Sequence, residues 1–171
     1  MKKNILLIAF CLISTLLSAQ KIKKNEIDKF TKSEIIETSS ETLYSVNFMG
    51  TGWCYMFDFC IRRVNGEYSM PTNILMRDIV KYTENDGVIF LLDNDDTVVL
   101  NTNYTGIGSE PFGKGYWFNT NFSLSKEDVE KLKNHKILSV RINYMDGKYD
   151  RDLKGNKKEM VMKCLKLFDN L

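Results

Sequence analysis

The 171-residue chain has little of what most catalytic sites require. It contains one histidine, so a Cys–His or Ser–His nucleophile pair would have to use His135. It has no CxxC and no HExxH spacing, which leaves too few grouped ligands for a zinc site. We therefore predict no cofactor, no metal site and no assigned catalytic residue. A pair of carboxylates for glycoside hydrolysis stays open, because the separation of two acids cannot be read from sequence.

The chain also lacks an excess of one charge. It carries 24 Lys and Arg residues against 22 Asp and Glu residues. A nucleic-acid-binding protein usually shows a basic surplus, because neutralisation of phosphates drives its affinity. Lysines alternate with acids along most of the chain, and the short cluster of Lys21, Lys23 and Lys24 is interpreted as a solvated tail. We therefore expect no nucleic-acid partner.

Long apolar runs are absent apart from one near the N-terminus. Lys2 and Lys3 precede an uncharged run over residues 5–17, and Ser18-Ala19-Gln20 follows. This order is typical of a secretory signal peptide cleaved after Ala19. The run is shorter than the roughly 20 apolar residues that cross a bilayer. The sequence therefore predicts export to the periplasm, the cell surface or the medium, with no transmembrane segment in the mature chain.

The chain shows no internal repeat and no linker rich in Pro, Gly or Ser, which favours one domain. We divide it into a signal peptide over 1–19, a polar N-terminal segment over 20–32 and a single domain over 33–171.

Alternating patterns within that domain predict strands joined by hairpins. The run from Trp53 to Arg63 has large apolar residues at its odd positions, and Asn65-Gly66 after it favours a type I′ turn. Residues 88–92 lack polar alternation, so we expect that strand to be buried on both faces. Further strands are expected over 33–49 and at 68–76, 87–93, 97–102, 116–123, 137–144 and 149–153.

Two helices are predicted. Ser125 with Asp128 three residues later resembles a capping box, and Leu124 with Val129 fits a hydrophobic staple, so a short helix should run over 126–134. A second signature at Asn156 opens a C-terminal helix over 157–169 with an apolar stripe. The fold class is therefore α+β, an antiparallel, hairpin-built sheet covered by two helices.

Three cysteines lie beyond the signal peptide, an odd number that leaves one thiol unpaired. Cys54 and Cys60 fall in one predicted strand, roughly 20 Å apart when extended, so they cannot pair with each other. A possible disulfide therefore joins Cys164 to Cys54 or Cys60. The alternative is three buried free thiols.

The stretch GSEPFGKG, residues 108–115, resembles a phosphate-binding P-loop but has Gly115 where Ser or Thr would bind Mg²⁺. A strand is expected after it, whereas a P-loop requires a helix there, so we predict no nucleotide. Loops on rigid scaffolds often carry function, and aromatic side chains beside glycines are hard to bury, which makes this stretch a candidate for binding a partner. The alternative is that its aromatic side chains fold back over the edge of the sheet. The possible recognition loop consists of Tyr104, Phe112, Lys114, Tyr116 and Trp117.

Two acidic groups raise the hypothesis of a calcium site. Residues 93–96 (DNDD) resemble the start of a calcium loop but lack its glycine and its distal Glu. Asp146, Asp150 and Asp152 form the second group, where nearby basic residues favour ion pairs. Ordinary turn chemistry accounts for acids at a hairpin tip.

Three segments, NEIDKFTKSEIIET, FSLSKEDVEKLKNHKILSVRI and NKKEMVMKCLKLF, together with SAQ at the end of the leader, resemble small exported proteins of unknown function that are common in Bacteroidota. The resemblance implies a periplasmic or surface location and an α+β fold, and it supplies no active site. Our leading hypothesis is a non-catalytic binding or interaction domain whose partner is a protein, a peptide or a glycan. The alternative is a small hydrolase acting on envelope or glycan material through carboxylates.

Overall fold

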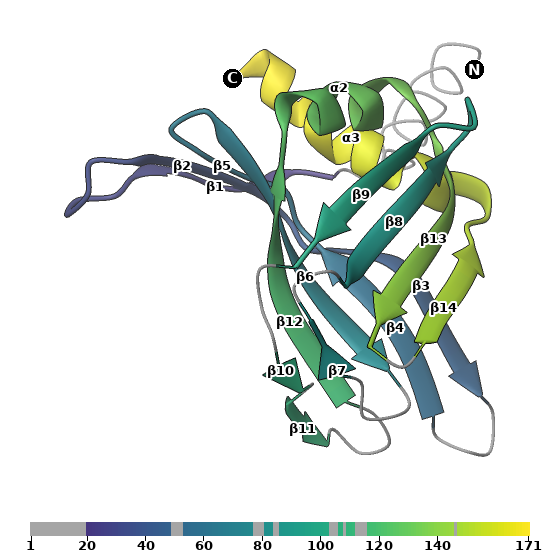
Figure 1. Ribbon diagram of the computed structural model, residues 1–171. Helices are drawn as coiled ribbons and strands as arrows, with labels where there is room; N and C mark the ends of the chain where they lie inside the picture. The colour runs from purple at the N-terminus through teal and green to yellow at the C-terminus, as the bar shows by residue number, and fades with distance from the viewer. Residues whose placement is uncertain are drawn as a thin grey trace, which may run out of the picture.

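The computed structural model describes residues 20–48, 53–76, 81–83, 86–102, 106–107, 109–111, 116–145 and 147–171. Antiparallel sheets dominate these residues, and two α-helices accompany them, as an α+β class requires. The predicted single sheet is divided into two larger sheets and a two-stranded pair. Figure 1 shows the two larger sheets as layers, with both helices gathered at one end of them.

The first sheet has eight strands and is built largely from hairpins. Its order is β1-β2-β5-β6-β12-β11, and β4 also pairs with β6 while β3 pairs with β4. The strands are β1 (Ile22–Ile27), β2 (Glu34–Thr38), β3 (Glu41–Phe48), β4 (Trp53–Phe59), β5 (Arg62–Val64), β6 (Glu67–Met76), β11 (Ser109–Pro111) and β12 (Tyr116–Leu124). The polar segment expected over 20–32 therefore contains a strand, β1.

The second sheet has four strands in the order β14-β13-β8-β9. They are β8 (Gly87–Leu92), β9 (Thr97–Asn101), β13 (Ile137–Tyr144) and β14 (Gly147–Asp152). A separate small pair joins β7 (Lys81–Tyr82) to β10 (Gly106–Ile107).

The helical parts follow the predicted positions only in part. Helix α2 (Lys126–Asn134) begins at the expected capping box, in which the Ser125 side chain and the Asp128 carboxylate each bond the other residue's N–H. The C-terminal segment is a 3-10 turn η1 (Gly155–Glu159), α3 (Met160–Lys166) and a second turn η2 (Leu167–Asn170). No side chain caps the start of η1 or of α3, so the capping role predicted for Asn156 is wrong.

The core lies between the two larger sheets and under the helices. Phe57 of the first sheet meets Phe90 of the second edge to face, with ring centroids 6.3 Å apart. The predicted stripe of the C-terminal helix is buried, namely Met160, Val161, Cys164, Leu165 and Phe168. One prediction is wrong: β8 is central in its sheet but is not buried on both faces, because Leu91 is 38% exposed.

An arm extends from this body (Figure 1). We define the arm as β1, β2 and β5 with the turns at residues 28–33 and 65–66. The predicted Asn65-Gly66 hairpin is confirmed, with φ of 49° and 87°, and the Asn65 side chain accepts the N–H of Glu34. Where the arm leaves the body, the buried Thr38 hydroxyl accepts the Ile61 N–H at 3.0 Å, which satisfies the backbone at that break.

Candidate functional site

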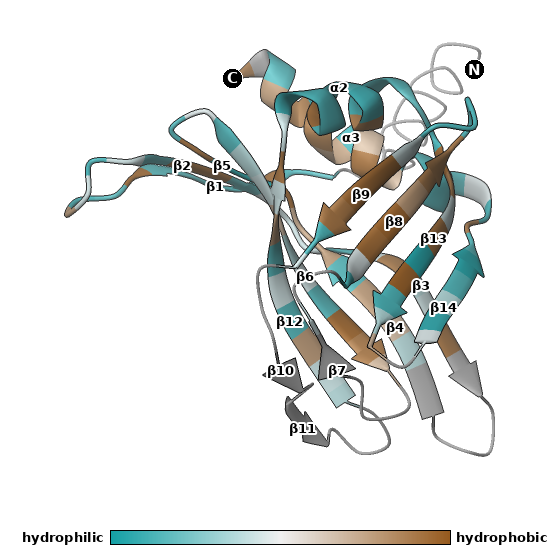
Figure 2. Cartoon of the chain, in the orientation of Figure 1, coloured by the Kyte–Doolittle hydropathy of each residue, from teal (hydrophilic) through white to brown (hydrophobic). Residues whose placement is uncertain are grey.

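Several outer strands leave a backbone edge unpaired among the described residues, and two of them, β3 and β14, come from different sheets and line one pocket together. In the part of the chain that the structure describes, strand β3 pairs with β4 alone and strand β14 pairs with β13 alone. Strand β1 covers the edge of β2 but does not continue along β3. Figure 2 colours β14 hydrophilic along most of its length, in contrast to the apolar central strand β8. Such unpaired edges are able to accept a further strand.

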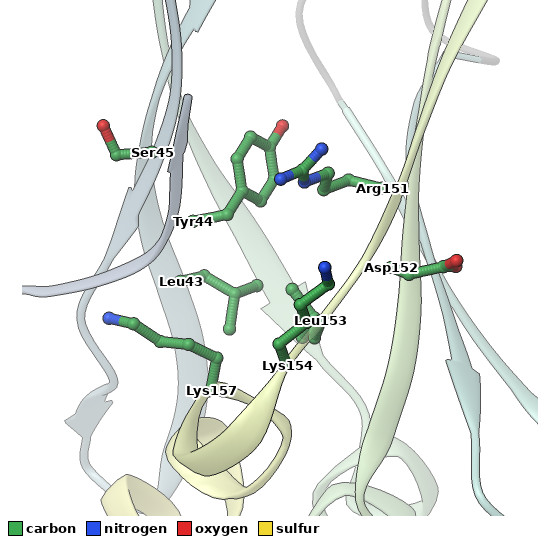
Figure 3. Close-up of a pocket in the computed structure, with 8 residues that line it drawn as sticks. All are labelled: Leu43, Tyr44, Ser45, Arg151, Asp152, Leu153, Lys154 and Lys157. Atoms are coloured by element: carbon green, nitrogen blue, oxygen red, sulfur yellow. The ribbon is translucent and has the colours of Figure 1, made fainter. Parts of the chain in front are cut away.

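A pocket of about 160 Å³ lies between these two outer strands. We call it the seam pocket, and Figure 3 shows its lining. It is lined by Leu43, Tyr44 and Ser45 of β3, by Arg151 and Asp152 of β14, and by Leu153, Lys154 and Lys157. Its size suits one side chain of a larger ligand, not a whole cofactor.

Positive charge dominates the seam pocket. The side chain of Arg151 reaches toward Tyr44, whereas the carboxylate of Asp152 is turned away from both (Figure 3). This division follows from strand geometry, because side chains alternate between the two faces of β14 and Asp152 lies on the outer face. The third cation, Lys157, donates a hydrogen bond to the carbonyl oxygen of Thr42. The pocket therefore has the charge that an anionic group requires.

Two further aromatic rings pack in sequence from Tyr44, the aromatic residue of the seam pocket. Tyr149 of β14 stacks on Tyr55 of β4 with ring centroids 4.6 Å apart and an interplanar angle of 9°. Tyr149 also contacts Tyr44 at 6.0 Å. Burial raises the pKa of the Tyr149 phenol, although Arg151 opposes that effect. The phenol therefore stays neutral at physiological pH, and the local charge is that of the cations.

A second cavity, of about 600 Å³, lies where α2 meets the start of β6, the end of β12 and the turn at Gly66 of the arm. We call it the arm groove. It is lined by Gly66, Glu67, Tyr68, Ser123, Leu124, Lys126, Val129, Glu130 and Lys133. Two lysines balance two glutamates in this lining, and Lys133 pairs with Asp169. The groove is larger than the seam pocket, but its balanced charges do not indicate one class of ligand.

The possible recognition loop falls largely outside the described residues. Tyr104, Phe112 and Lys114 are not described, and their role stays a prediction. Tyr116 and Trp117 begin β12, which confirms that a strand follows GSEPFGKG in place of a helix. Both side chains are half-buried, and neither lines the seam pocket or the arm groove.

His135 is held by neighbours that are not nucleophiles. Its Nδ1 lies 3.1 Å from Asp93 Oδ1, and its Nε2 lies 3.3 Å from the side-chain amide of Asn94. An aspartate on one ring nitrogen resembles the orienting half of a catalytic triad, but an amide takes the place of a hydroxyl or thiol. These contacts describe a histidine that ties α2 to the β8–β9 turn.

The acids proposed for calcium point to separate partners. In the first group Asp93 meets His135, and Asp96 pairs with Lys131 at 3.1 Å. In the second group Asp150 is bound by both Nε and Nη2 of Arg141 at 2.7 Å, which lowers the pKa of its carboxyl. Asp146 is outside the described residues. Within the described ranges, no cluster of three or more His, Cys, Asp or Glu side chains is arranged to hold a metal ion.

The disulfide expected between Cys164 and Cys60 is not formed. Both residues are free thiols, and burial raises their pKa values, to about 11 for Cys60 and to about 12 for Cys164. Cys164 lies on the buried stripe of α3, as the alternative of buried free thiols requires. Because Cys164 is a free thiol, the alternative disulfide with Cys54 is not formed either.

Sequence reasoning missed the residues of the seam pocket. In the sequence, Asp152 belongs to an acidic group with basic neighbours and Lys157 belongs to the capping signature that begins at Asn156. No pattern assigns either residue, or Arg151 or Lys154, to a binding site. The available signal was alternation: in GKYDRD of β14, Tyr149 and Arg151 share one face and the acids share the other.

No known protein-family model, curated protein or solved structure matches the chain. Within the described residues, no helix combines the length and the apolar character that crossing a bilayer requires.

Proposed function

We propose that this chain is a non-catalytic interaction protein that binds an extended, acidic peptide segment of a partner along the open edge of β14. The observation that carries the proposal is the unpaired edge of β14 beside a pocket lined by Arg151, Lys154 and Lys157. Addition of a strand to an open edge supplies main-chain hydrogen bonds, and pockets for alternate side chains supply specificity.

The hydrogen-bonding phase of β14 defines which backbone groups a ligand would use. The Arg151 carbonyl accepts from Ser139 Oγ at 3.1 Å, and the Leu153 N–H donates to the Leu138 carbonyl at 2.9 Å. Both groups thus point toward β13. Because backbone groups alternate along an antiparallel strand, those of Lys148, Asp150 and Asp152 point to the open edge. A ligand strand would bond to these three residues.

The inward side chains of β14 set the sequence that such a ligand needs. Tyr149 and Arg151 face the interior of the sandwich, two residues apart. In an added strand, residues directly opposite lie on the same face. The ligand therefore places an acidic side chain opposite Arg151 and, two positions away, an apolar side chain opposite Tyr149. The seam pocket has room for the single acidic side chain.

Binding of synthetic peptides tests this proposal. Ten-residue peptides with an Asp or Glu two positions from a Leu or Phe, and otherwise β-favouring, are titrated by fluorescence anisotropy. The charge reversals Arg151→Glu and Lys154→Glu are each expected to weaken binding at least about tenfold, a change of roughly 1.4 kcal/mol. Lys166→Glu is the matched control, because Lys166 is exposed on α3 and lines neither cavity.

A backbone substitution separates strand addition from simple charge attraction. N-methylation of alternate amides in the peptide removes the donors that face β14 and is expected to abolish binding. Methylation of the intervening amides is expected to be tolerated. Equal affinity for both methylated peptides, or undiminished binding by Arg151→Glu, would show that β14 is not the binding edge.

We also infer that this interaction occurs outside the cytoplasm, on the grounds of the leader-like segment at residues 1–19. The test is the N-terminal sequence of the protein recovered from its native cells. A start at Gln20 is expected, and a retained Met1 in a cytoplasmic fraction would contradict the inference.

A further inference from the structure

Strand β1 forms the outer edge of the arm, and its far side is unpaired among the described residues. The ladder with β2 fixes the direction of its backbone groups. The Asp28 N–H donates to the Ser33 carbonyl, and the N–H groups of Asn65 and Ser39 bond to the Glu34 and Lys21 carbonyls. Lys24 lies opposite Glu37 and Glu26 lies opposite Ile35. Since hydrogen-bonding residues alternate along the strand, the backbone N–H and carbonyl groups of Lys24 and Glu26 point toward β2. The backbone groups of Asn25 and Ile27 therefore point outward.

We propose that β1 pairs with the β1 strand of a second copy of this chain, antiparallel and two-fold symmetric about Asn25. A two-fold axis normal to the sheet keeps equivalent residues on the same face. It places Asn25 opposite its own equivalent, where the outward N–H and carbonyl of each copy meet. The next outward residue, Ile27, then also meets the partner strand.

Charge selects this register over its neighbours. In the Asn25-centred pairing, Lys24 of each copy lies opposite Glu26 of the other copy. A shift of one residue in either strand direction, with the two-fold axis retained, brings Lys24 against Lys24 or Glu26 against Glu26. Unlike charges directly opposite each other stabilise a strand pair, and like charges destabilise it. In the single chain, Lys24 and Glu26 pair with each other at 2.9 Å and are both substantially exposed, so they are free to exchange partners.

Exposed apolar side chains near the tip of the arm also favour a second copy of the chain as the partner of β1. Ile27 is 69% exposed and Phe30 is 82% exposed. The turn that presents them is ordered, because Asp28 Oδ1 accepts the N–H of Phe30 at 2.9 Å and of Thr31 at 2.7 Å. In the two-fold pairing, Ile27 lies opposite Lys23 of the second copy, and the methylene chain of that lysine covers it.

The first residues of β1 carry two features that disfavour non-specific pairing of its open edge with other strands. A register shift lies between Ile22 and Lys24, and lysines occupy positions 23 and 24. Bulges and edge lysines disfavour most partner strands. A second β1 is an exception, because it supplies Glu26 opposite Lys24. The interface is a single strand pair, so we expect it to fall below the roughly 1,000 Å² of a stable dimer and to be weak.

Complementation between two charge variants tests the pairing. Sedimentation velocity of the full chain over a wide concentration range is expected to show a reversible dimer. Lys24→Glu leaves acids at both positions 24 and 26, and Glu26→Lys leaves lysines at both of these positions. Each variant alone is expected to dimerise at least about tenfold more weakly, because two unlike pairs become like pairs. An equimolar mixture of the two is expected to form a heterodimer with regained affinity.

Both variants have lost the Lys24–Glu26 ion pair within the chain. Affinity regained in the mixture therefore comes from ion pairs between the two copies. Asn25→Pro, which removes an outward N–H and no bond to β2, is expected to abolish the dimer without changing the melting temperature by more than a few degrees. Glu130→Lys on α2 is the matched charge control and is expected to dimerise normally. A wild-type chain that is monomeric at every concentration, a mixture without heterodimer, or a dimer that survives Asn25→Pro would overturn the proposal.

Discussion

The two long edges of the sandwich differ in how their outer strands meet. At one edge β9 contacts β12, and α2 contacts both strands. Buried apolar side chains such as Phe122 and Val98 lie on those strands. At the other edge β3 and β14 leave the seam pocket between them, lined by Tyr44, two leucines and three cations among others. We call the first edge sealed, because apolar side chains fill the space between its strands, and the second edge open, because a pocket remains between its strands.

The largest effect is expected at the sealed edge. Phe122 is 1% exposed, so Phe122→Ala removes a buried ring and leaves a cavity. We expect the free energy of unfolding to fall by about 3–5 kcal/mol. Urea denaturation followed by circular dichroism measures the loss.

The same kind of deletion at the open edge is expected to cost less. Tyr149 is half-buried, and its main contacts are the rings of Tyr55 and Tyr44. Tyr149→Ala is expected to lower the free energy of unfolding by about 1–2 kcal/mol. A loss as large as that of Phe122→Ala, in the same urea titration, would contradict the distinction between a sealed and an open edge.

Lys157 tests how far polar contacts hold the open edge together. Its ammonium group donates to the Thr42 carbonyl of β3, so it joins η1 to that strand. Lys157→Ala is expected to destabilise the fold by about 1 kcal/mol, because one charge-assisted hydrogen bond is lost. Lys166→Ala, on an exposed position of α3, serves as the control and is expected to be neutral. Equal free energies of unfolding for the two variants would show that the Lys157 hydrogen bond does not stabilise the open edge.

The smallest effect is expected on the outer face of β14, and it depends on pH. Arg141 binds the Asp150 carboxylate and lowers its pKa in the folded state. A lowered pKa stabilises the fold above the ordinary value of about 3.9, and this contribution is lost as the pH falls through the lowered value. The pair is exposed, so the contribution is below about 1 kcal/mol.

Urea midpoints at a series of acidic pH values, for the wild-type chain and Asp150→Asn, measure that contribution. The two curves are expected to converge as the pH falls. If the difference in urea midpoint between the two chains grew toward low pH, the Arg141–Asp150 pair would not stabilise the fold in the way that the lowered pKa requires. Peptide binding should be unchanged in Asp150→Asn, because this side chain faces away from the seam pocket.

Local sequence patterns predicted individual turns and helix starts better than they predicted how the strands pair into sheets. The Asn65-Gly66 turn and the Ser125 capping box are each set by a few neighbouring residues, and both are present. The division into two larger sheets depends on which hairpins pair across long sequence distances. Apolar content alone led to the wrong expectation for β8, because Leu91 remains exposed on the outer face of its sheet.

The candidate site was harder to predict for the same reason. Alternation along β14 places Arg151 on the inward face, and this could have been read from the sequence. That β3 lies across from β14 could not, because β3 belongs to the other sheet and contributes Tyr44 from more than a hundred residues away. The unpaired state of an edge is likewise a property of the whole fold.

Amide hydrogen exchange reports directly on whether a peptide strand adds to the edge of β14. Exchange is measured for each amide with and without a bound acidic peptide. We expect exchange at the amides of Lys148, Asp150 and Asp152 to slow markedly on binding, while exchange at the amides of β9 at the sealed edge does not change. Unchanged exchange at these three amides under saturating peptide would contradict strand addition at β14.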